Sequence, residues 1–241
     1  ALAPTEDRVP PALIRKGDVW KVDVMSVAAG AEGGLASAEA TVGNTPPTPP
    51  EVVVVPGEPR VGQALVASIK RPAADVDGDP VTLAYAWTVN GKPAADLKGP
   101  DVPPARVKKG ETWSVAVTPS DGVAPGEKAT AAVTAVNTQP EPPVVSLGEP
   151  FIRAGATITF QQLKPATDVD GDPVKVTRRW LVNGGEVPAW ADKDKLSWPE
   201  LKKNQRVRVE VTPNDGAATG RTAFAEVQTR NTPPTAPQVA F

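Results

Sequence analysis

Three aspartates that alternate within five residues carry the strongest chemical signal in this sequence. The segment reads Asp75-Val76-Asp77-Gly78-Asp79, and its glycine permits a sharp turn that would gather the carboxylates. Hard cations such as calcium take six to eight oxygen ligands, which clustered carboxylates supply. The segment is not an EF-hand loop, because its glycine is at the fourth position and not the sixth. The alternative is an ordinary turn whose carboxylates accept hydrogen bonds from backbone amides.

The acidic segment is one landmark of an internal repeat. It returns 93 residues later, with Asp168, Asp170 and Asp172 in place of the first three aspartates. Two further motifs return at offsets of 93 and 94 residues, and an Asn-Thr pair before a Pro-rich run occurs three times. These landmarks are Trp87-Thr88-Val89-Asn90-Gly91 with Trp180-Leu181-Val182-Asn183-Gly184, Val117-Thr118-Pro119-Ser120-Asp121-Gly122 with Val211-Thr212-Pro213-Asn214-Asp215-Gly216, and Asn44, Asn137 and Asn231.

The two ends of the sequence match parts of the same repeat. Gly17-Asp18-Val19-Trp20 corresponds to Gly110-Glu111-Thr112-Trp113, so residues 1–43 are expected to be the second half of a further copy. Gln238-Val239-Ala240-Phe241 is expected to be the opening strand of another. A half sandwich would expose Trp20, Val22 and Val24 to water. We therefore expect an excerpt from a longer array; a self-complementing polymer is the competing interpretation.

Each repeat shows the two-residue periodicity of half-buried strands. Leu83, Tyr85 and Trp87 fall on one face of a strand, and Asn90-Gly91 and Asn183-Gly184 favour type I′ hairpin turns. A unit of about 93 residues with about seven short strands and a Trp on the third resembles an immunoglobulin-like (Ig-like) sandwich. The sequence thus predicts an all-β chain of tandem Ig-like sandwiches, arranged as a half repeat (1–43), a Pro-rich linker (44–50), a complete repeat (51–136), a linker (137–142), a complete repeat (143–230), and a linker with a first strand (231–241).

The motif series resembles the Ig-like repeats of large bacterial surface proteins, akin to bacterial cadherin-like and polycystic-kidney-disease-type domains. In an Ig-like sandwich the loop between the second and third strands and the loop between the last two lie at one pole. The preceding linker enters at the same pole, which resembles the interdomain calcium arrangement of cadherins. The expected calcium ligands are Asp75, Asp77, Asp79, Asp121 and Asn44 in one repeat, and Asp168, Asp170, Asp172, Asp215 and Asn137 in the next.

The composition excludes several other kinds of site. The chain has no Cys and no His, so disulfides, thiolate or imidazole metal sites and Ser–His or Cys–His nucleophiles are ruled out. Its 28 acidic and 26 basic residues give no basic footprint for nucleic acid, and no segment is apolar enough to span a membrane. Paired aspartates can hydrolyse glycosides, but the aspartates of this chain recur in each complete repeat beside a linker, where no deep pocket is expected. We therefore do not expect an enzyme.

Two smaller features have competing interpretations. Trp190 and Trp198 flank an irregular stretch and have no counterpart in the other complete repeat. They are expected to pack under a long loop, although an exposed Trp pair could stack on sugar rings. The pairs Lys108-Lys109 and Lys202-Lys203, each ahead of a strand, are expected to be solvated turns.

The expected function is mechanical. Tandem repeats contact mainly their neighbours in the same chain, so the array would act as a semi-rigid stalk of a secreted or cell-surface bacterial protein, with calcium stiffening its joints. Its partners would be the neighbouring repeats, with other copies or cell-surface ligands as further candidates. The alternatives are an accessory carbohydrate-binding module array of a secreted hydrolase and a subunit of an assembled extracellular fibre.

Overall fold

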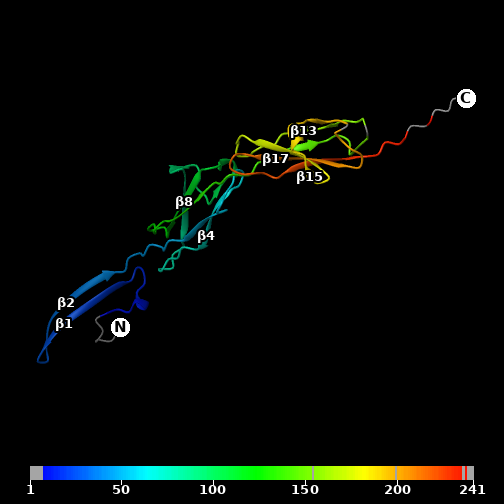
Figure 1. Cartoon of the computed structure of the whole chain (residues 1–241). Coiled ribbons are helices and arrows are strands. Elements are labelled where there is room, and N and C mark those ends of the chain that lie inside the picture. The colour runs from blue at the N-terminus through cyan, green and yellow to red at the C-terminus, as the bar shows by residue number, and fades with distance from the viewer. Residues whose placement is uncertain (1–7, 154, 199, 235–236, 238–241) are drawn as a thin grey trace. The chain divides into compact units, whose positions relative to one another are not determined.

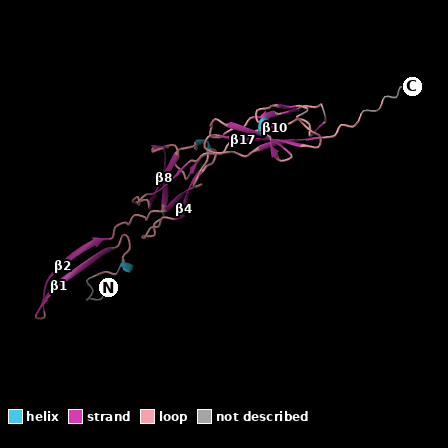
Figure 2. Cartoon of the chain, in the orientation of Figure 1, coloured by secondary structure: helices cyan, strands magenta, loops and turns pink. Residues whose placement is uncertain are grey.

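The computed structural model describes residues 8–153, 155–198, 200–234 and 237, and strands and loops dominate them (Figure 2). The helices among these residues are three 3-10 turns, η1 (Pro11–Leu13), η2 (Pro104–Arg106) and η3 (Pro188–Trp190). Each begins at a proline, whose fixed φ suits the first helical position. The predicted all-β class of Ig-like sandwiches is confirmed. No helix in the described part of the chain is long and apolar enough to cross a membrane.

The chain forms two compact units. The first consists of Ala1–Pro59, Ala64–Arg106 and Glu111–Thr134, and the second of Arg60–Gln63, Val107–Gly110 and Ala135–Phe241. The first unit contains a sandwich of seven strands in two sheets, ordered β3-β4-β7 and β6-β5-β8-β9. Strands β4 and β8 of this sandwich are labelled in Figure 1. Its strands are β3 (Glu51–Val55), β4 (Leu65–Arg71), β5 (Thr82–Val89), β6 (Lys92–Pro93), β7 (Asp101–Val102), β8 (Thr112–Ser120) and β9 (Ala129–Thr134).

The core of the first sandwich follows the two-residue periodicity of its strands. Along β8 every second residue is buried, including Trp113, Val115 and Val117. Trp87 on β5 is 2% exposed and meets the Trp113 ring edge-on, with 6.4 Å between the ring centroids. The turn after β5 has φ of +50° at Asn90 and +76° at Gly91, which is the geometry of the predicted type I′ hairpin.

The second unit repeats this plan with two differences in the sheets: an added strand in the larger sheet, and two small sheets in place of the three-stranded one. Its five-stranded sheet has the order β11-β18-β17-β14-β15, and β10-β13 and β12-β16 form two smaller sheets. Strand β11 pairs in parallel with β18, a pairing without a counterpart in the first sandwich. The strands are β10 (Val144–Ser146), β11 (Phe151–Ile152), β12 (Ile158–Thr159), β13 (Gln161–Lys164), β14 (Lys175–Val182), β15 (Gly185–Glu186), β16 (Lys195–Leu196), β17 (Arg206–Asn214) and β18 (Ala223–Thr229).

The core of the second sandwich is built around Trp180 on β14, which is fully buried. It faces Val209 on β17, as Trp87 faces Val115. Val207 takes the place of Trp113, and the cluster also includes Leu147, Ile158, Leu196, Leu201, Val211 and Val227. The turn after β14 has φ of +50° at Asn183 and +88° at Gly184, so the second predicted hairpin has the same geometry.

Residues before the first linker form a two-stranded hairpin, β1 (Val19–Ala28) and β2 (Ala31–Thr41), whose register equals that of β8 and β9. Val22 and Val24 are 56% and 60% exposed, whereas Trp20, which the sequence also predicted to be exposed, is partly buried. The hairpin closes directly at Ala29-Gly30. It therefore lacks the longer loop that carries Asp121 in the next repeat. The expected strand at Gln238–Phe241 lies outside the described residues.

Candidate metal centre

The acidic loop is organised by its first aspartate. Asp75 Oδ1 accepts the backbone N–H groups of Asp77 at 2.9 Å and Asp79 at 3.2 Å, while Gly78 turns the chain with φ of +85°. Asp168 Oδ1 does the same for Asp170 at 2.8 Å and Asp172 at 3.2 Å. These are the carboxylate-capped turns that Asp favours. One oxygen of each leading aspartate is therefore committed to loop shape.

The loop between β8 and β9 contributes Asp121. Its Oδ1 accepts the N–H groups of Val123 and Ala124, both at 2.7 Å, and its Oδ2 accepts the Asn44 side-chain amide at 2.8 Å. The backbone hydrogen bond from Ala124 and then the Asn44 amide lower the pKa of Asp121 from 3.8 to about 2. The charged form is thus the one this loop stabilises.

Asp215, between β17 and β18, has the same surroundings. It accepts the N–H groups of Ala217 at 2.7 Å and Ala218 at 2.6 Å, and the Asn137 amide at 2.9 Å. The Asn137 amide, followed by the Ala218 hydrogen bond, lowers the pKa of Asp215. In both repeats, then, the linker asparagine is fastened to the last loop of the sandwich it precedes.

Three carboxylates converge in each repeat. One oxygen each from Asp75, Asp79 and Asp121 lie within 4.8 Å of one another, and so do oxygens of Asp168, Asp172 and Asp215. Ligands on opposite sides of a calcium ion lie up to about 5 Å apart, given bonds of about 2.3–2.6 Å. The two sets, which we call the first and second acidic clusters, have the spacing of a cation site.

Asp77 and Asp170 take a different position from the one expected. The Thr45 N–H donates to Asp77 Oδ2 at 2.7 Å, and the Thr138 N–H donates to Asp170 Oδ2 at 2.6 Å. Neither belongs to the group of carboxylate oxygens that converge within 4.8 Å. These two aspartates instead fasten the backbone of the linker to the acidic loop.

Several buried oxygens at the clusters have no hydrogen-bond partner among the described residues. They are Asp75 Oδ2 and Asn44 Oδ1 in the first cluster, and Asp168 Oδ2 in the second. Buried polar oxygens are nearly always paired with protein, water or an ion. Carboxylate and amide oxygens are the donors that calcium prefers, so these atoms fit a cation in their chemistry.

A lysine contacts each cluster, and here the expectation of a solvated turn is wrong for Lys109. Its Nζ donates to Asn137 Oδ1 at 2.8 Å and also to Asp172 Oδ2. Lys16 Nζ donates to Asp79 Oδ2 at 2.5 Å. Hydrogen bonds to these aspartates raise the pKa of both lysines. The sequence signal was present, because Lys16-Gly17 and Lys109-Gly110 are 93 residues apart, but the reach of a long side chain is not readable from sequence.

Two glycines allow the linker to pack against the last loop. A Cβ on Gly126 would lie 2.1 Å from the Pro47 carbonyl oxygen, and one on Gly220 would lie 2.1 Å from that of Pro140. These glycines were missed in the sequence, although they recur 94 residues apart. Only a residue without a side chain lets the two backbones approach this closely.

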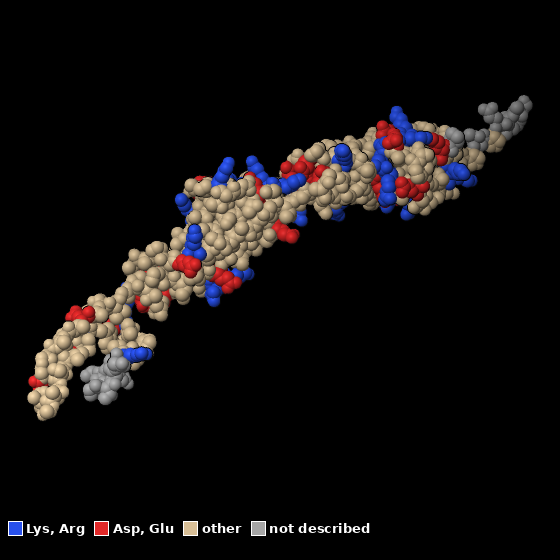
Figure 3. Space-filling view, turned by 60° about the vertical axis from the view of Figure 1, so that its left-hand side comes forward, with Lys and Arg blue, Asp and Glu red and all other residues tan. Residues whose placement is uncertain are grey.

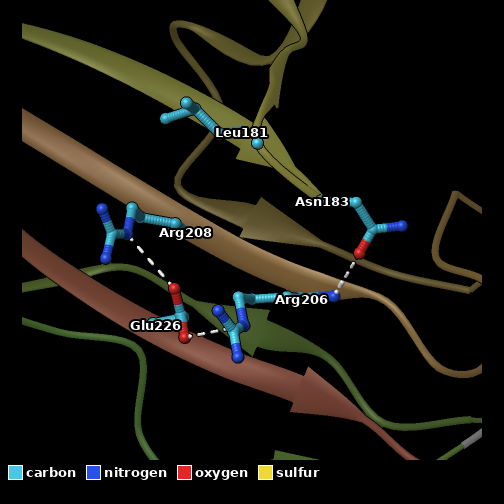
Figure 4. A pocket seen from close by; sticks show the side chains of 6 residues that line it. Leu181, Asn183, Arg206, Arg208 and Glu226 are labelled. Carbon is cyan, nitrogen blue, oxygen red and sulfur yellow. Dashed lines mark hydrogen bonds and ion pairs between the residues drawn. The ribbon is translucent and has the colours of Figure 1, made fainter.

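The tryptophans and surface depressions offer no comparable chemistry. Trp190 packs partly buried against the core of the second sandwich, whereas Trp198 is 43% exposed, so the two do not form an open platform. In the depression of Figure 4, Glu226 Oε2 accepts from Arg208 Nε at 3.2 Å and Glu226 Oε1 lies 3.2 Å from Arg206 Nε. Glu226 on β18 thus pairs with both arginines of β17. On the face in Figure 3, acidic and basic side chains are interspersed.

Comparisons with known proteins give structural similarity only. No family model and no curated protein matches the chain. Among solved structures, the FN1–FN3 domains of chicken CNTN1 are 13% identical, with 89% of this chain and 77% of that chain covered and a TM-score of 0.33. The N-terminal Ig1–2 module of the Drosophila receptor protein tyrosine phosphatase DLAR is 16% identical, with coverages of 76% and 99% and a TM-score of 0.24. At these values the similarities say nothing about function.

Proposed function

We propose that this chain is a structural or adhesive segment of a secreted or cell-surface bacterial protein, a semi-rigid stalk of Ig-like repeats whose joints are stiffened by calcium. The observation that carries this proposal is the duplication of one constellation. The same seven contact residues occur at both linkers: three clustered aspartates, a linker-fastening aspartate, an asparagine, a threonine and a lysine. A duplicated catalytic centre would need a pocket at each position, whereas a duplicated joint needs only a linker.

The contacts explain how the linker is held. Asp121 fixes the Asn44 side chain, Asp77 fixes the Thr45 backbone, and Thr48 and Ala74 form three hydrogen bonds at 2.8, 3.0 and 3.1 Å. A Pro-rich segment is already extended and stiff. Fastening it at three successive points removes much of its remaining freedom to bend.

Calcium would complete this arrangement in the first acidic cluster. Asp75 Oδ2 and Asn44 Oδ1 are the oxygens without a hydrogen-bond partner there, and the carboxylates of Asp79 and Asp121 supply further negative charge. A bound ion would replace the mutual repulsion of three carboxylates with shared coordination. Because the asparagine belongs to the linker and the aspartates to the sandwich, one ion would join the two.

The test is calorimetric titration of calcium into chelator-stripped protein, together with melting curves at several calcium concentrations. We expect two sites with dissociation constants of about 10⁻⁴–10⁻³ M, the range of extracellular modules. The melting temperature should rise with the logarithm of free calcium above that range.

Variants assign the sites. Asp75→Asn should remove the first site and Asp168→Asn the second, whereas Asp192→Asn, an exposed carboxylate outside both clusters, should retain both. Absence of binding and an unchanged melting curve at millimolar calcium would reduce the loops to ordinary turns. The stiffness would then come from the Pro-rich linkers alone.

A further inference from the structure

Each acidic cluster already contains a positive charge supplied by the protein. The Lys16 ammonium is hydrogen-bonded to Asp79, and the Lys109 ammonium bridges Asp172 and Asn137. The side chains of Lys16 and Lys109 are 31% and 34% exposed, and those of Asp79 and Asp172 are 30% and 26% exposed. The pairs are therefore partly shielded from water, which makes them less open to screening by salt than fully exposed pairs.

The backbone presents the lysine in the same way each time. The residue after it has positive φ, +85° at Gly17 and +77° at Gly110. The N–H of that residue donates to a carbonyl two positions before the linker asparagine, from Gly17 to Val42 at 3.0 Å and from Gly110 to Ala135 at 2.8 Å. The turn that carries the lysine is thereby bonded to the residues directly before the linker.

A third copy of this turn lies in the second sandwich. Asn204 follows Lys203 with φ of +60°, and its N–H donates to the Thr229 carbonyl at 2.9 Å, two positions before Asn231. Lys203 is exposed and lies outside both acidic clusters. Among the described residues, the turn therefore forms without an ion pair from Lys203 to an aspartate or glutamate. The position of the lysine thus follows from the turn and does not require the aspartates.

We propose that Lys16 and Lys109 are the resident cations of the two acidic clusters. When no metal is bound, each lysine holds the chain at its linker against the acidic loop, and it competes with calcium for the same aspartate oxygens. The calcium part of this proposal rests on the proposed function above. Asp79 Oδ2 and Asp172 Oδ2 accept from the ammonium, so the ammonium occupies space beside the same oxygens that a calcium ion would approach. Two cations within one group of three carboxylates would also repel each other.

The metal-free arm of the test replaces both lysines with methionine, which keeps most of the apolar stem and removes the charge. In excess chelator, Lys16→Met/Lys109→Met should melt about 2–4 °C below the wild type, the scale of one partly shielded ion pair per sandwich. Lys203→Met is the matched control, at the same position of the same turn, and should melt like the wild type. Lys16→Arg/Lys109→Arg retains the charge and should recover most of the loss. Equal melting temperatures for the methionine double variant and the control would overturn the proposal.

The calcium arm uses calorimetric titration of the same proteins with calcium chloride. Removing the competing ammonium should tighten calcium binding roughly tenfold in the double methionine variant and leave the control unchanged. Equal affinities in the wild type and the double variant would overturn the competition. Absence of calcium binding in every protein would refute the calcium joint of the proposed function, and the melting comparison in chelator would then decide alone whether the lysines hold the linkers.

Discussion

The two core tryptophans occupy equivalent positions but differ in one hydrogen bond, and this difference can be measured. The Nε1–H of Trp87 donates to the Gly99 carbonyl at 3.0 Å. The Nε1–H of Trp180 is buried without a partner among the described residues. Trp87→Phe and Trp180→Phe delete the same atoms from nearly equally buried rings, so their apolar and cavity costs are similar.

The polar costs have opposite signs. Trp87→Phe loses a hydrogen bond with a net value of about 1 kcal/mol. Trp180→Phe removes an unpaired buried donor and regains about 1–3 kcal/mol. The edge-on contact of Trp87 with Trp113 adds to the cost of Trp87→Phe and has no equivalent for Trp180→Phe. We therefore expect Trp87→Phe to destabilise its own sandwich by about 2–4 kcal/mol more than Trp180→Phe destabilises the other.

Hydrogen exchange followed by mass spectrometry across a urea series gives the free energy of unfolding for each sandwich separately. Peptides from β5 and β8 report on the first sandwich, and peptides from β14 and β17 report on the second. An equal or greater cost for Trp180→Phe would refute the reasoning. It would show either that Trp180 finds a partner in solution or that the two cores tolerate the smaller ring differently.

Two further predictions concern the linkers. Gly126→Ala and Gly220→Ala each place a methyl group 2.1 Å from a linker carbonyl oxygen. Each should therefore destabilise its sandwich by about 1–3 kcal/mol in urea unfolding and weaken calcium binding at that linker alone. Gly99→Ala, with open space around its Cβ, is the control, and an effect no larger than that of the control would contradict the packing. The contribution of Asp121, whose pKa is lowered from 3.8 to about 2, should be complete above about pH 4 and should be lost as the pH falls through 2. Carbon NMR of the Asp121 carboxyl checks this, and a midpoint near 3.8 would show that the hydrogen bonds from Ala124 and Asn44 are not formed in solution.

The parts of the fold that depend on local periodicity could be predicted from the sequence. Alternating apolar residues mark β5 and β8, and Asn90-Gly91 and Asn183-Gly184 mark hairpins, because these signals involve neighbouring residues only. The repeat register also places the two acidic loops beside the two last loops. The parallel pairing of β11 with β18 was not predictable, since two-residue strands carry no periodicity of their own.

The site was predictable as a set of residues but not as a set of contacts. Asp75 and Asp77 have the same residue type and are two positions apart, yet one caps the loop and the other fastens the Thr45 backbone. That division depends on which way each side chain faces once the loop has turned at Gly78. The contribution of Lys16 depends on a contact 63 residues away along the chain, which spacing within one motif does not reveal.

The two interpretations of the acidic segment, an ordinary turn or a cation site, concern different oxygens of the same carboxylates. Asp75 Oδ1 and Asp121 Oδ1 accept the backbone amides that shape their loops. Asp75 Oδ2 remains unpartnered, and Asp121 Oδ2 accepts only from the linker asparagine among the bonds formed in the described residues. Because each carboxylate has two oxygens, turn formation fixes the direction of the second one. The turn therefore does not compete with the cation. It preorganises the oxygens that a lysine ammonium or a calcium ion would contact. The linker can then be fastened with little further loss of side-chain entropy.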